Sequence, residues 1–174
     1  MSIRESEWTR SMIPTQGVQG SVYKLTNKRD RSRQLILKSF NERTYYYSEL
    51  AALKAVQGHQ GFPQLFEYSP ETITTNGNSD NLTPNKMEIV LECFDLSLEQ
   101  AAHHLHYKKL VRDQAHSLTL QLLDCVETLH KLGLVHGDLK PDNICLKLRG
   151  ESLSLYLIDF GLATKFCDDN GNHI

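Results

Sequence analysis

The first part of the chain alternates short apolar runs with polar stretches, a pattern typical of strands. Residues 22–25 and 35–38 favour strands, and the polar, charged stretch 26–33 between them predicts a hairpin loop. We therefore expect strands from about Trp8 to Phe40. The period then changes: Leu50, Leu53 and Val56 fall on one face of a helix predicted over about 42–57.

The middle of the chain predicts two more strands separated by a polar stretch. Residues 64–68 and 87–94 are apolar runs of strand length. Residues 70–86 between them carry Asn-Gly and a proline, which predicts an exposed loop. The Ser-Leu-Glu at 97–99 opens a short helix that we expect to run to about residue 106.

The longest periodic segment, residues 110–132, predicts an amphipathic helix that Gly133 ends. Its apolar stripe comprises Ala115, Leu118, Leu122, Val126 and Leu129. Two later apolar runs, 144–148 and 153–158, predict strands on either side of a polar turn at 149–151. The chain is therefore rich in strands in its first half and has its longest helix in its second.

Composition and charge narrow the class of protein. The 174 residues suffice for one domain with a core or for two small lobes, and the formal net charge of −2 gives no electrostatic reason to expect nucleic acid or an anionic membrane as a partner. No apolar run approaches the roughly 20 residues that cross a bilayer, and the N-terminus lacks a signal-peptide core. The four cysteines form no Cys-x-x-Cys pair and fit reduced thiols. We expect an intracellular, cytoplasmic protein, with nuclear or cytoskeletal association left open.

A polar loop between two apolar runs carries the strongest chemical signal. Residues 134–146 read Leu-Val-His-Gly-Asp-Leu-Lys-Pro-Asp-Asn-Ile-Cys-Leu, which predicts a strand, a loop and a second strand. The loop offers the carboxylate of Asp138, the ammonium of Lys140 and the amide of Asn143, and Asp159 follows a later apolar run. Phosphoryl transfer needs this set. One carboxylate orients or deprotonates a hydroxyl, a second carboxylate and an amide oxygen hold magnesium, and a lysine offsets phosphate charge.

The loop and the Ile-Asp-Phe-Gly at 158–161 have the order and spacing of two motifs of the protein kinases, which the chain resembles over nearly its whole length. The Gln-Gly-His-Gln-Gly-Phe-Pro at 57–63 and the Ser-Leu-Glu at 97–99 resemble the casein kinase I branch. The resemblance implies an α+β, bilobal fold. Residues 1–94 would form the small lobe and hinge, an antiparallel sheet with one helix, and residues 95–174 the first part of a mainly helical large lobe. It also implies a Ser/Thr protein kinase that transfers the γ-phosphoryl group of Mg-ATP to protein hydroxyls.

The resemblance assigns catalytic and metal-binding roles. Asp138 would orient the substrate hydroxyl and accept its proton. Lys140 would neutralise the γ-phosphate, as in Ser/Thr rather than Tyr kinases. Asn143 and Asp159 would hold magnesium.

The resemblance also assigns the nucleotide site. Lys38, fixed by Glu49 on the helix at 42–57, would grip the α- and β-phosphates of ATP. The other nucleotide contacts that it implies are Gly17, Gly20, Val22, Glu92, Phe94 and Cys145.

Three residues depart from the kinase pattern. Thr15 replaces the first glycine of the glycine-rich loop, and Ile36 stands where a small alanine usually lies over the adenine ring. Gly137 replaces the arginine that commonly receives an activation-loop phosphate, which argues against switching by that route. A second interpretation therefore stays open, a catalytically weak or inactive kinase-derived scaffold or binding module within a larger assembly. A third, a small-molecule kinase of related fold, is disfavoured by the Lys-Pro-Asp-Asn loop.

The sequence ends at Ile174, shortly after the Asp-Phe-Gly motif. The resemblance implies that the parts of the large lobe that support the catalytic loop and bind protein substrate lie outside it. We therefore expect the apolar stripe of the 110–132 helix to have lost its cover, and to need a partner or the remainder of the large lobe. A protein substrate is the partner that the reaction implies.

Overall fold

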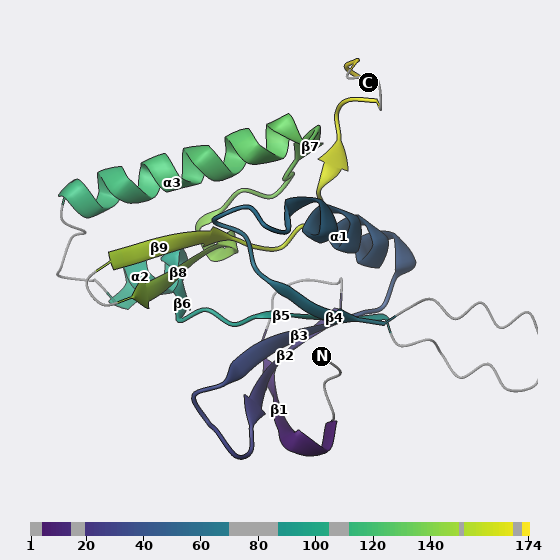
Figure 1. Cartoon of the computed structure of the whole chain (residues 1–174), viewed down its shortest axis with the longest axis vertical. Coiled ribbons are helices and arrows are strands. Elements are labelled where there is room, and N and C mark those ends of the chain that lie inside the picture. The colour runs from purple at the N-terminus through teal and green to yellow at the C-terminus, as the bar shows by residue number, and fades with distance from the viewer. Residues whose placement is uncertain (1–4, 15–19, 70–86, 105–111, 150–151, 169–171) are drawn as a thin grey trace, which may run out of the picture. The chain divides into compact units, whose positions relative to one another are not determined.

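The computed structural model describes residues 5–14, 20–69, 87–104, 112–149, 152–168 and 172–174 (Figure 1). The chain divides into two compact units, one made of Met1–Tyr47 and Leu65–Cys93 and the other of Ser48–Gln64 and Phe94–Ile174. The predicted polar loop at 70–86, the end of the predicted short helix at 105–106 and part of the predicted turn at 149–151 lie outside the described residues.

The first unit is built on an antiparallel sheet of five strands in the order β1-β2-β3-β5-β4 (Figure 1). The strands are β1 (Trp8–Ile13), β2 (Gly20–Asn27), β3 (Gln34–Phe40), β4 (Leu65–Tyr68) and β5 (Met87–Glu92), and a 3-10 turn, η1 (Glu5–Glu7), precedes β1. The predicted strands and the hairpin between β2 and β3 are confirmed. The strand predicted over 87–94 ends two residues earlier, before the chain leaves the sheet.

One face of this sheet carries a buried apolar cluster. Leu25, Leu37 and Val90 form a buried cluster, and Leu37 lies opposite Val90 in the register of β3 and β5. Trp8, Tyr23 and Leu35 pack against this cluster and are partly buried. Because successive side chains of a strand point to opposite faces, Ile36 and Lys38 lie on the other face, opposite Leu91 and Ile89 of β5.

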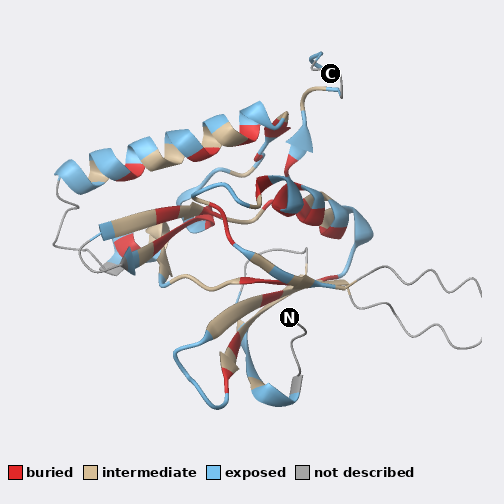
Figure 2. Cartoon of the chain, in the orientation of Figure 1, coloured by how far each residue is buried: buried red, intermediate tan, exposed pale blue. Residues whose placement is uncertain are grey.

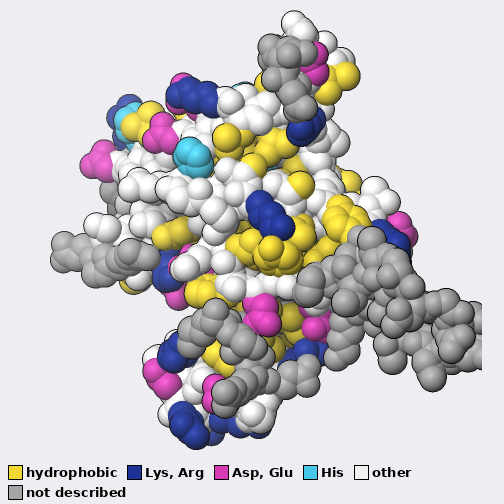
Figure 3. Space-filling model, turned by 45° about the vertical axis from the view of Figure 1, so that its right-hand side comes forward, with side chains coloured by type: hydrophobic (Ala, Val, Ile, Leu, Met, Phe, Trp, Pro, Cys, Tyr) yellow, Lys and Arg dark blue, Asp and Glu magenta, His cyan; other side chains and the backbone are white. Residues whose placement is uncertain are grey.

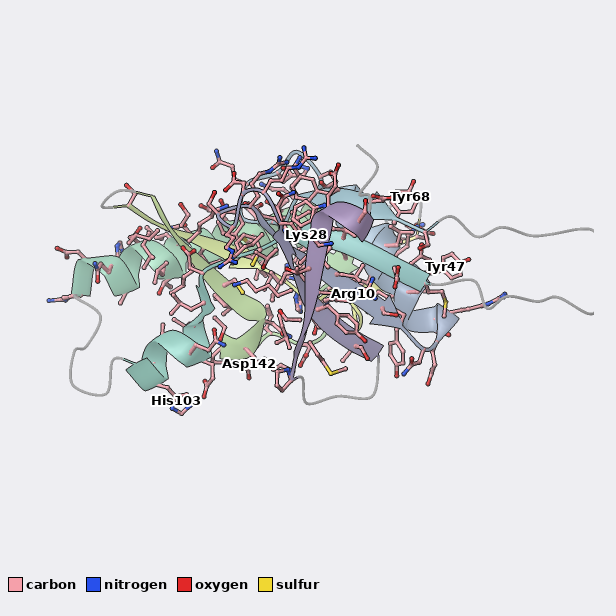
Figure 4. All side chains as sticks on the ribbon, turned by 90° about the horizontal axis from the view of Figure 1, so that it is seen from below. Arg10, Lys28, Tyr47, Tyr68, His103 and Asp142 are labelled. Atoms are coloured by element: carbon pink, nitrogen blue, oxygen red, sulfur yellow. The ribbon has the colours of Figure 1, made fainter. Side chains whose placement is uncertain are left out.

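Basic side chains at the edge of the first unit are held by ordinary surface contacts. The Lys28 Nζ donates a hydrogen bond to the backbone oxygen of Ser6 at 2.7 Å. Arg10 is labelled in Figure 4. Its guanidinium lies 5.0 Å from the centre of the Tyr23 ring and 3.8 Å from the Glu88 carboxylate. On the face shown in Figure 3, basic and acidic side chains are interspersed, in keeping with the net charge of −2.

Helix α1 (Arg43–Val56) runs from the first unit into the second and lies within the predicted helix at 42–57. The three residues of its predicted apolar face, Leu50, Leu53 and Val56, are buried. Glu49 is fully buried on the same helix. Gly58 follows the helix in the left-handed backbone region, with φ at +85°, where glycine is favoured.

The second unit combines two small sheets with two helices (Figure 1). One sheet has the order β6-β8-β9, and the other pairs β7 with β10. The strands are β6 (Leu96–Ser97), β7 (Leu134–Val135), β8 (Ile144–Arg149), β9 (Ser152–Leu157) and β10 (Thr164–Lys165). The two helices are α2 (Leu98–His104) and α3 (Arg112–Lys131), and a 3-10 turn, η2 (Pro141–Asn143), precedes β8. The long helix, the short helix as far as it is described and the two late strands are confirmed.

Helix α3 is fastened to β9 by apolar packing and by one side chain. Its buried residues are Leu118, Cys125 and Leu129. Figure 2 shows the buried parts of α3 on the side of the helix that faces β9. The Gln121 Oε1 accepts a hydrogen bond from the backbone nitrogen of Leu155 at 2.9 Å, and its Nε2 donates to the backbone oxygen of Leu153 at 3.2 Å. Burial raises the pKa of the Cys125 thiol to about 11, so this thiol stays protonated.

The expectation that the stripe of α3 has lost its cover needs correction. Leu118 and Leu129 of that stripe are only 6% and 1% exposed, and the strands β9 and β7 pack against α3. The exposed leucines of α3 are instead Leu120 and Leu123, at 49% and 58%. Ala115, Leu122 and Val126 of the stripe are half-buried, so the predicted stripe is covered in part rather than left bare.

The described part of the chain contains no helix that is both long and apolar enough to cross a bilayer. The four cysteines all lie within the described residues and form no disulfide.

Candidate active site

The loop between β7 and β8 brings three of the predicted site residues into direct contact. The Lys140 Nζ donates a hydrogen bond to the Asp138 Oδ2 at 2.6 Å. The Asn143 Nδ2 donates to the same oxygen at 2.9 Å and to the backbone oxygen of Asp138 at 2.8 Å. The turn η2 makes this possible, because it folds the chain back after Lys140 and brings Asn143 within hydrogen-bonding distance of Asp138.

Interactions within this cluster shift the pKa values of Asp138 and Lys140. The hydrogen bond from Lys140 is the largest cause that holds the pKa of Asp138 below its ordinary value, and the hydrogen bond from Asn143 acts in the same direction. The same bond to Asp138 raises the pKa of Lys140. The negative charge of Asp159 raises both pKa values, so this second carboxylate lies within electrostatic reach of the pair. Near neutral pH, Asp138 is therefore an ionised acceptor beside a charged lysine.

The hydrogen bonds of Asn143 fix the direction of its amide. Both of its described side-chain bonds are donated by the nitrogen to oxygens of Asp138, and only the Nδ2 can be a donor. The Oδ1 therefore points away from Asp138 and remains as an oxygen donor for a hard cation. Asn143 is only 5% exposed, so its orientation is set by the protein rather than by solvent.

The backbone of Ile158 ties the end of β9 to this loop. Its nitrogen donates to the backbone oxygen of Asn143 at 2.9 Å, and its oxygen lies 3.0 Å from the His136 Nε2. The next residue, Asp159, has a φ of +67°, an unusual conformation for a residue other than glycine. The peptide groups on both sides of Ile158 are thus hydrogen-bonded to the loop between β7 and β8. These bonds place Asp159 next to that loop.

His136 connects the two acidic segments. Its Nε2 must donate, because its partner is the carbonyl oxygen of Ile158, and its Nδ1 must accept, because the backbone nitrogen of Asp138 donates to it at 3.2 Å. The two bonds together assign the neutral ring with its proton on Nε2. The ring also packs on Phe160 with 5.1 Å between ring centres, and it is buried.

The first unit holds other predicted nucleotide contacts on neighbouring strands. Lys38 on β3 lies opposite Val22 on β2, so their side chains share a face of the sheet, and Glu92 ends β5. Gly20 starts β2 with φ at +151°, and a β-carbon there would lie 1.9 Å from the backbone oxygen of Ser39. Only glycine fits such an approach. Gly17 lies outside the described residues.

The second unit holds the remaining three, apart from the loop cluster. Glu49 is buried on α1. Cys145 is buried on β8 opposite Tyr156 of β9, and the Phe94 ring packs on the Tyr156 ring with 4.4 Å between centres. Phe94 and Cys145 are thus both neighbours of Tyr156, at one end of the β6-β8-β9 sheet.

Comparison with known proteins identifies the family. The family model described as the protein kinase domain matches residues 14–173. The chain belongs to the protein kinase family. This agrees with the strand-rich α+β fold and with the resemblance of the two motifs.

The relatives of this kinase chain carry Ser/Thr kinase names. A probable casein kinase I homologue of Encephalitozoon cuniculi is 26% identical over 159 residues, which cover 89% of this chain and 45% of that protein. A probable cell division protein kinase of the same organism is 31% identical over 153 residues, covering 83% and 43%. Serine/threonine-protein kinase 1 of African swine fever virus is 24% identical over 140 residues, covering 79% and 41%. The chain spans less than half the length of these relatives, and family membership implies the use of ATP and a divalent metal ion.

Sequence reasoning missed several contacts of this kinase site. It did not predict His136 as a hydrogen-bonded bridge, although a histidine two residues before Asp138 was the available signal. It gave no role to Ser48, whose Oγ donates to the backbone oxygen of Ala163 at 2.7 Å. Nothing in the sequence around Ser48 could have indicated a bond to a residue 115 positions away.

Proposed function

We propose that the chain is the nucleotide-binding and catalytic part of a casein kinase I-type Ser/Thr protein kinase, which works inside the cell and transfers the γ-phosphoryl group of Mg-ATP to protein hydroxyls. The observation that carries the proposal is the contact of Lys140 and Asn143 with one carboxylate oxygen of Asp138. The kinship with a probable casein kinase I homologue supports the subtype. In this proposal residues 1–94 act as the small lobe and hinge, and residues 95–174 begin the large lobe.

Asp138 has the properties that the acceptor of a hydroxyl proton needs. Its lowered pKa keeps it ionised near neutral pH, and its backbone is held by His136 and Asn143. A substrate hydroxyl would donate a hydrogen bond to this carboxylate while its oxygen forms the bond to phosphorus. The bond from phosphorus to the leaving oxygen of ADP breaks, and the proton passes to Asp138. Lys140, already charged beside the carboxylate, would offset the negative charge of the transferring group.

The residues near Asp138 fit a divalent metal ion. The Asn143 Oδ1 and the Asp159 carboxylate offer the hard oxygens that magnesium prefers. A bound magnesium ion would neutralise charge on the β- and γ-phosphates. The protein's own part is to fix both ligands: η2 and the Asp138 contacts hold Asn143, and the clamped peptide groups of Ile158 hold Asp159.

The nucleotide contacts that we propose are those that the kinase resemblance assigns. Lys38, on the sheet face that also carries Val22, would meet the phosphates, with buried Glu49 as its partner. The tight approach at Gly20 would let backbone amides come close to a phosphate. The other proposed contacts are Gly17, Val22, Glu92, Phe94 and Cys145.

A phosphorylation assay with matched acidic variants tests the proposal. Radiolabelled Mg-ATP and dephosphorylated casein are supplied to the wild-type chain, to Asp138→Asn and Lys38→Met, and to Asp142→Asn as control. Asp142 lies in the same loop but is exposed (Figure 4). Loss of the catalytic base typically costs about 10²–10⁴-fold in rate. We expect a loss of that size for Asp138→Asn, no measurable turnover for Lys38→Met and near wild-type rates for Asp142→Asn.

Equal phosphorylation by all four proteins would show that the activity does not come from this site. Thermal shift with Mg-ATP separates the remaining interpretations. Binding without turnover by the wild type would favour a nucleotide-stabilised scaffold, and absence of both would favour a binding module without a nucleotide.

A further inference from the structure

The segment that follows Asp159-Phe160-Gly161 contacts the loop between β7 and β8, which carries Asp138 and is called the catalytic loop below. The contact is at Gly137. The backbone oxygen of Leu162 lies 2.4 Å from the place that a β-carbon on Gly137 would occupy, and its carbonyl carbon lies 3.2 Å from that place. Gly137 also has a φ of +80°, in the left-handed region. Any side chain at 137 would therefore push this segment away and strain its own backbone.

The next residue of the segment is held from another direction. The Ser48 Oγ on α1 donates to the backbone oxygen of Ala163 at 2.7 Å. Two consecutive carbonyl groups are thus fixed by different elements, that of Leu162 against the catalytic loop and that of Ala163 by the helix. Ser48 directly precedes Glu49, so the same turn of α1 carries both the tether and the buried acid.

Backbone pairing continues the contact beyond Ala163. Thr164 and Lys165 form β10, which pairs antiparallel with β7, and the nitrogen of Phe166 donates to the oxygen of Gly133 at 3.0 Å. Backbone bonds of this kind place no demand on side-chain identity. The contacts at Gly137 and Ser48 do, because the first needs glycine and the second needs a hydroxyl.

We propose that Gly137 and Ser48 are positioning residues, which set the segment after Asp159 against the loop that carries Asp138 without help from a phosphorylated side chain. Both contacts are uncharged and belong to the chain itself, so the placement is permanent rather than switched. As far as it concerns turnover, this inference rests on the proposed function. The placement of the segment does not.

Two glycine variants isolate the contact at Gly137. Gly137→Ala and Gly58→Ala each add one methyl group at a left-handed position, with φ at +80° and +85°. The β-carbon at 58 meets nothing within 4 Å, whereas the one at 137 meets Leu162. Backbone strain therefore acts in both variants, and the clash with Leu162 acts only in Gly137→Ala.

Hydrogen exchange and kinetics are the measurements. We expect the amides of Ala163 and Phe166, which donate to Phe160 and Gly133 respectively, to exchange at least about tenfold faster in Gly137→Ala and unchanged in Gly58→Ala. Misplacing reacting groups by about 1 Å can cost on the order of 10²-fold in rate. We therefore expect kcat on casein to fall about 10–100-fold in Gly137→Ala, with the KM for ATP within about threefold of wild type. Equal exchange and equal kcat in the two alanine variants would overturn the inference.

Ser48 provides a second test that does not depend on how well Gly137→Ala folds. Ser48→Ala removes the hydroxyl, and Ser48→Thr keeps one. Faster exchange at Ala163 with a lower kcat in the alanine variant, both restored by threonine, supports the tether, and identical behaviour of the two variants contradicts it. Phosphatase treatment of the wild type should leave kcat unchanged, and a fall would contradict the permanent placement. If the wild type shows no turnover, the proposed function fails, while the exchange rates still decide the placement.

Discussion

The amide nitrogen of Asn143 donates two hydrogen bonds to one residue, Asp138, at 2.8 Å to its backbone oxygen and at 2.9 Å to its carboxylate. One buried side chain thereby sets both the fold of the loop and the direction of the acid. Replacing it should disturb stability and electrostatics together.

Asn143→Ala is expected to lower the free energy of unfolding by about 1–3 kcal/mol, because two oxygens of Asp138 lose a largely buried donor. Asn172→Ala is the control. The Asn172 Nδ2 also donates to an aspartate, Asp168, at 3.0 Å, but Asn172 is exposed and its backbone bond to Asp168 survives in alanine, so the change should cost less than about 0.5 kcal/mol. Urea unfolding measures both, and equal costs would contradict the structural role of Asn143.

Lys140→Met is expected to raise the pKa of Asp138 toward its ordinary value, since the hydrogen bond from Lys140 is the largest cause of the lowered pKa. Carbon NMR titration of the Asp138 carboxyl group measures this directly. Lys131→Met removes an exposed ion pair to Glu127 on α3 and should leave the Asp138 titration unchanged. An Asp138 titration that is the same in Lys140→Met and wild type would refute the assignment.

The same pair predicts a pH dependence of stability. The folded-state pKa of Asp138 lies below its unfolded-state value, so the ionised carboxylate stabilises the fold above the ordinary aspartate pKa of about 4. This contribution disappears as the pH falls through the folded-state pKa. The difference in unfolding free energy between wild type and Lys140→Met should therefore be largest above about pH 4 and shrink in acid. A difference that grows on acidification would have the wrong sign.

His136 is expected to be neutral, with its proton on Nε2, because Ile158 accepts at that nitrogen and the Asp138 amide donates to the other. Nitrogen NMR of the imidazole ring near neutral pH distinguishes the two tautomers. His103, an exposed histidine 3.0 Å from Glu99, serves as the reference ring (Figure 4). A proton found on the His136 Nδ1 would break the described bridge.

Leu129→Ala is expected to destabilise the chain by about 2–5 kcal/mol, because this residue is 1% exposed on the covered side of α3. Leu123→Ala makes the same change on the same helix at a position 58% exposed and should cost less than about 0.5 kcal/mol. Thermal or urea unfolding compares them. Similar costs at the two positions would mean that β9 does not cover the helix as described.

Local sequence pattern was sufficient to predict most elements. Runs of strand-favouring residues indicated β2 and β3. The three- and four-residue steps indicated α1 and α3, because this period follows from helix geometry. The order Asp138, Asn143, Asp159 likewise indicated the kinase family before any coordinates, since the chemistry requires those groups. The structure then showed that the first two touch and that the third lies within electrostatic reach.

Contacts between distant segments were beyond the reach of sequence pattern. The cover of α3 depends on how β9 packs and on the two backbone bonds of Gln121, and neither leaves a periodic trace in the sequence. The need for glycine at 137 arises from a backbone oxygen 25 positions later, so the sequence shows only that arginine is missing. Tertiary packing, rather than local preference, decides such positions.

The left-handed backbone of Asp159 has a consequence for mutagenesis. Among residues with side chains, aspartate and asparagine adopt φ near +67° with the least difficulty, and glycine adopts it freely. In a library of variants at position 159, a first screen for soluble, folded protein and a second screen for metal-dependent nucleotide binding would select different residues. Asparagine and glycine would survive the first screen, and only the wild-type residue would survive the second.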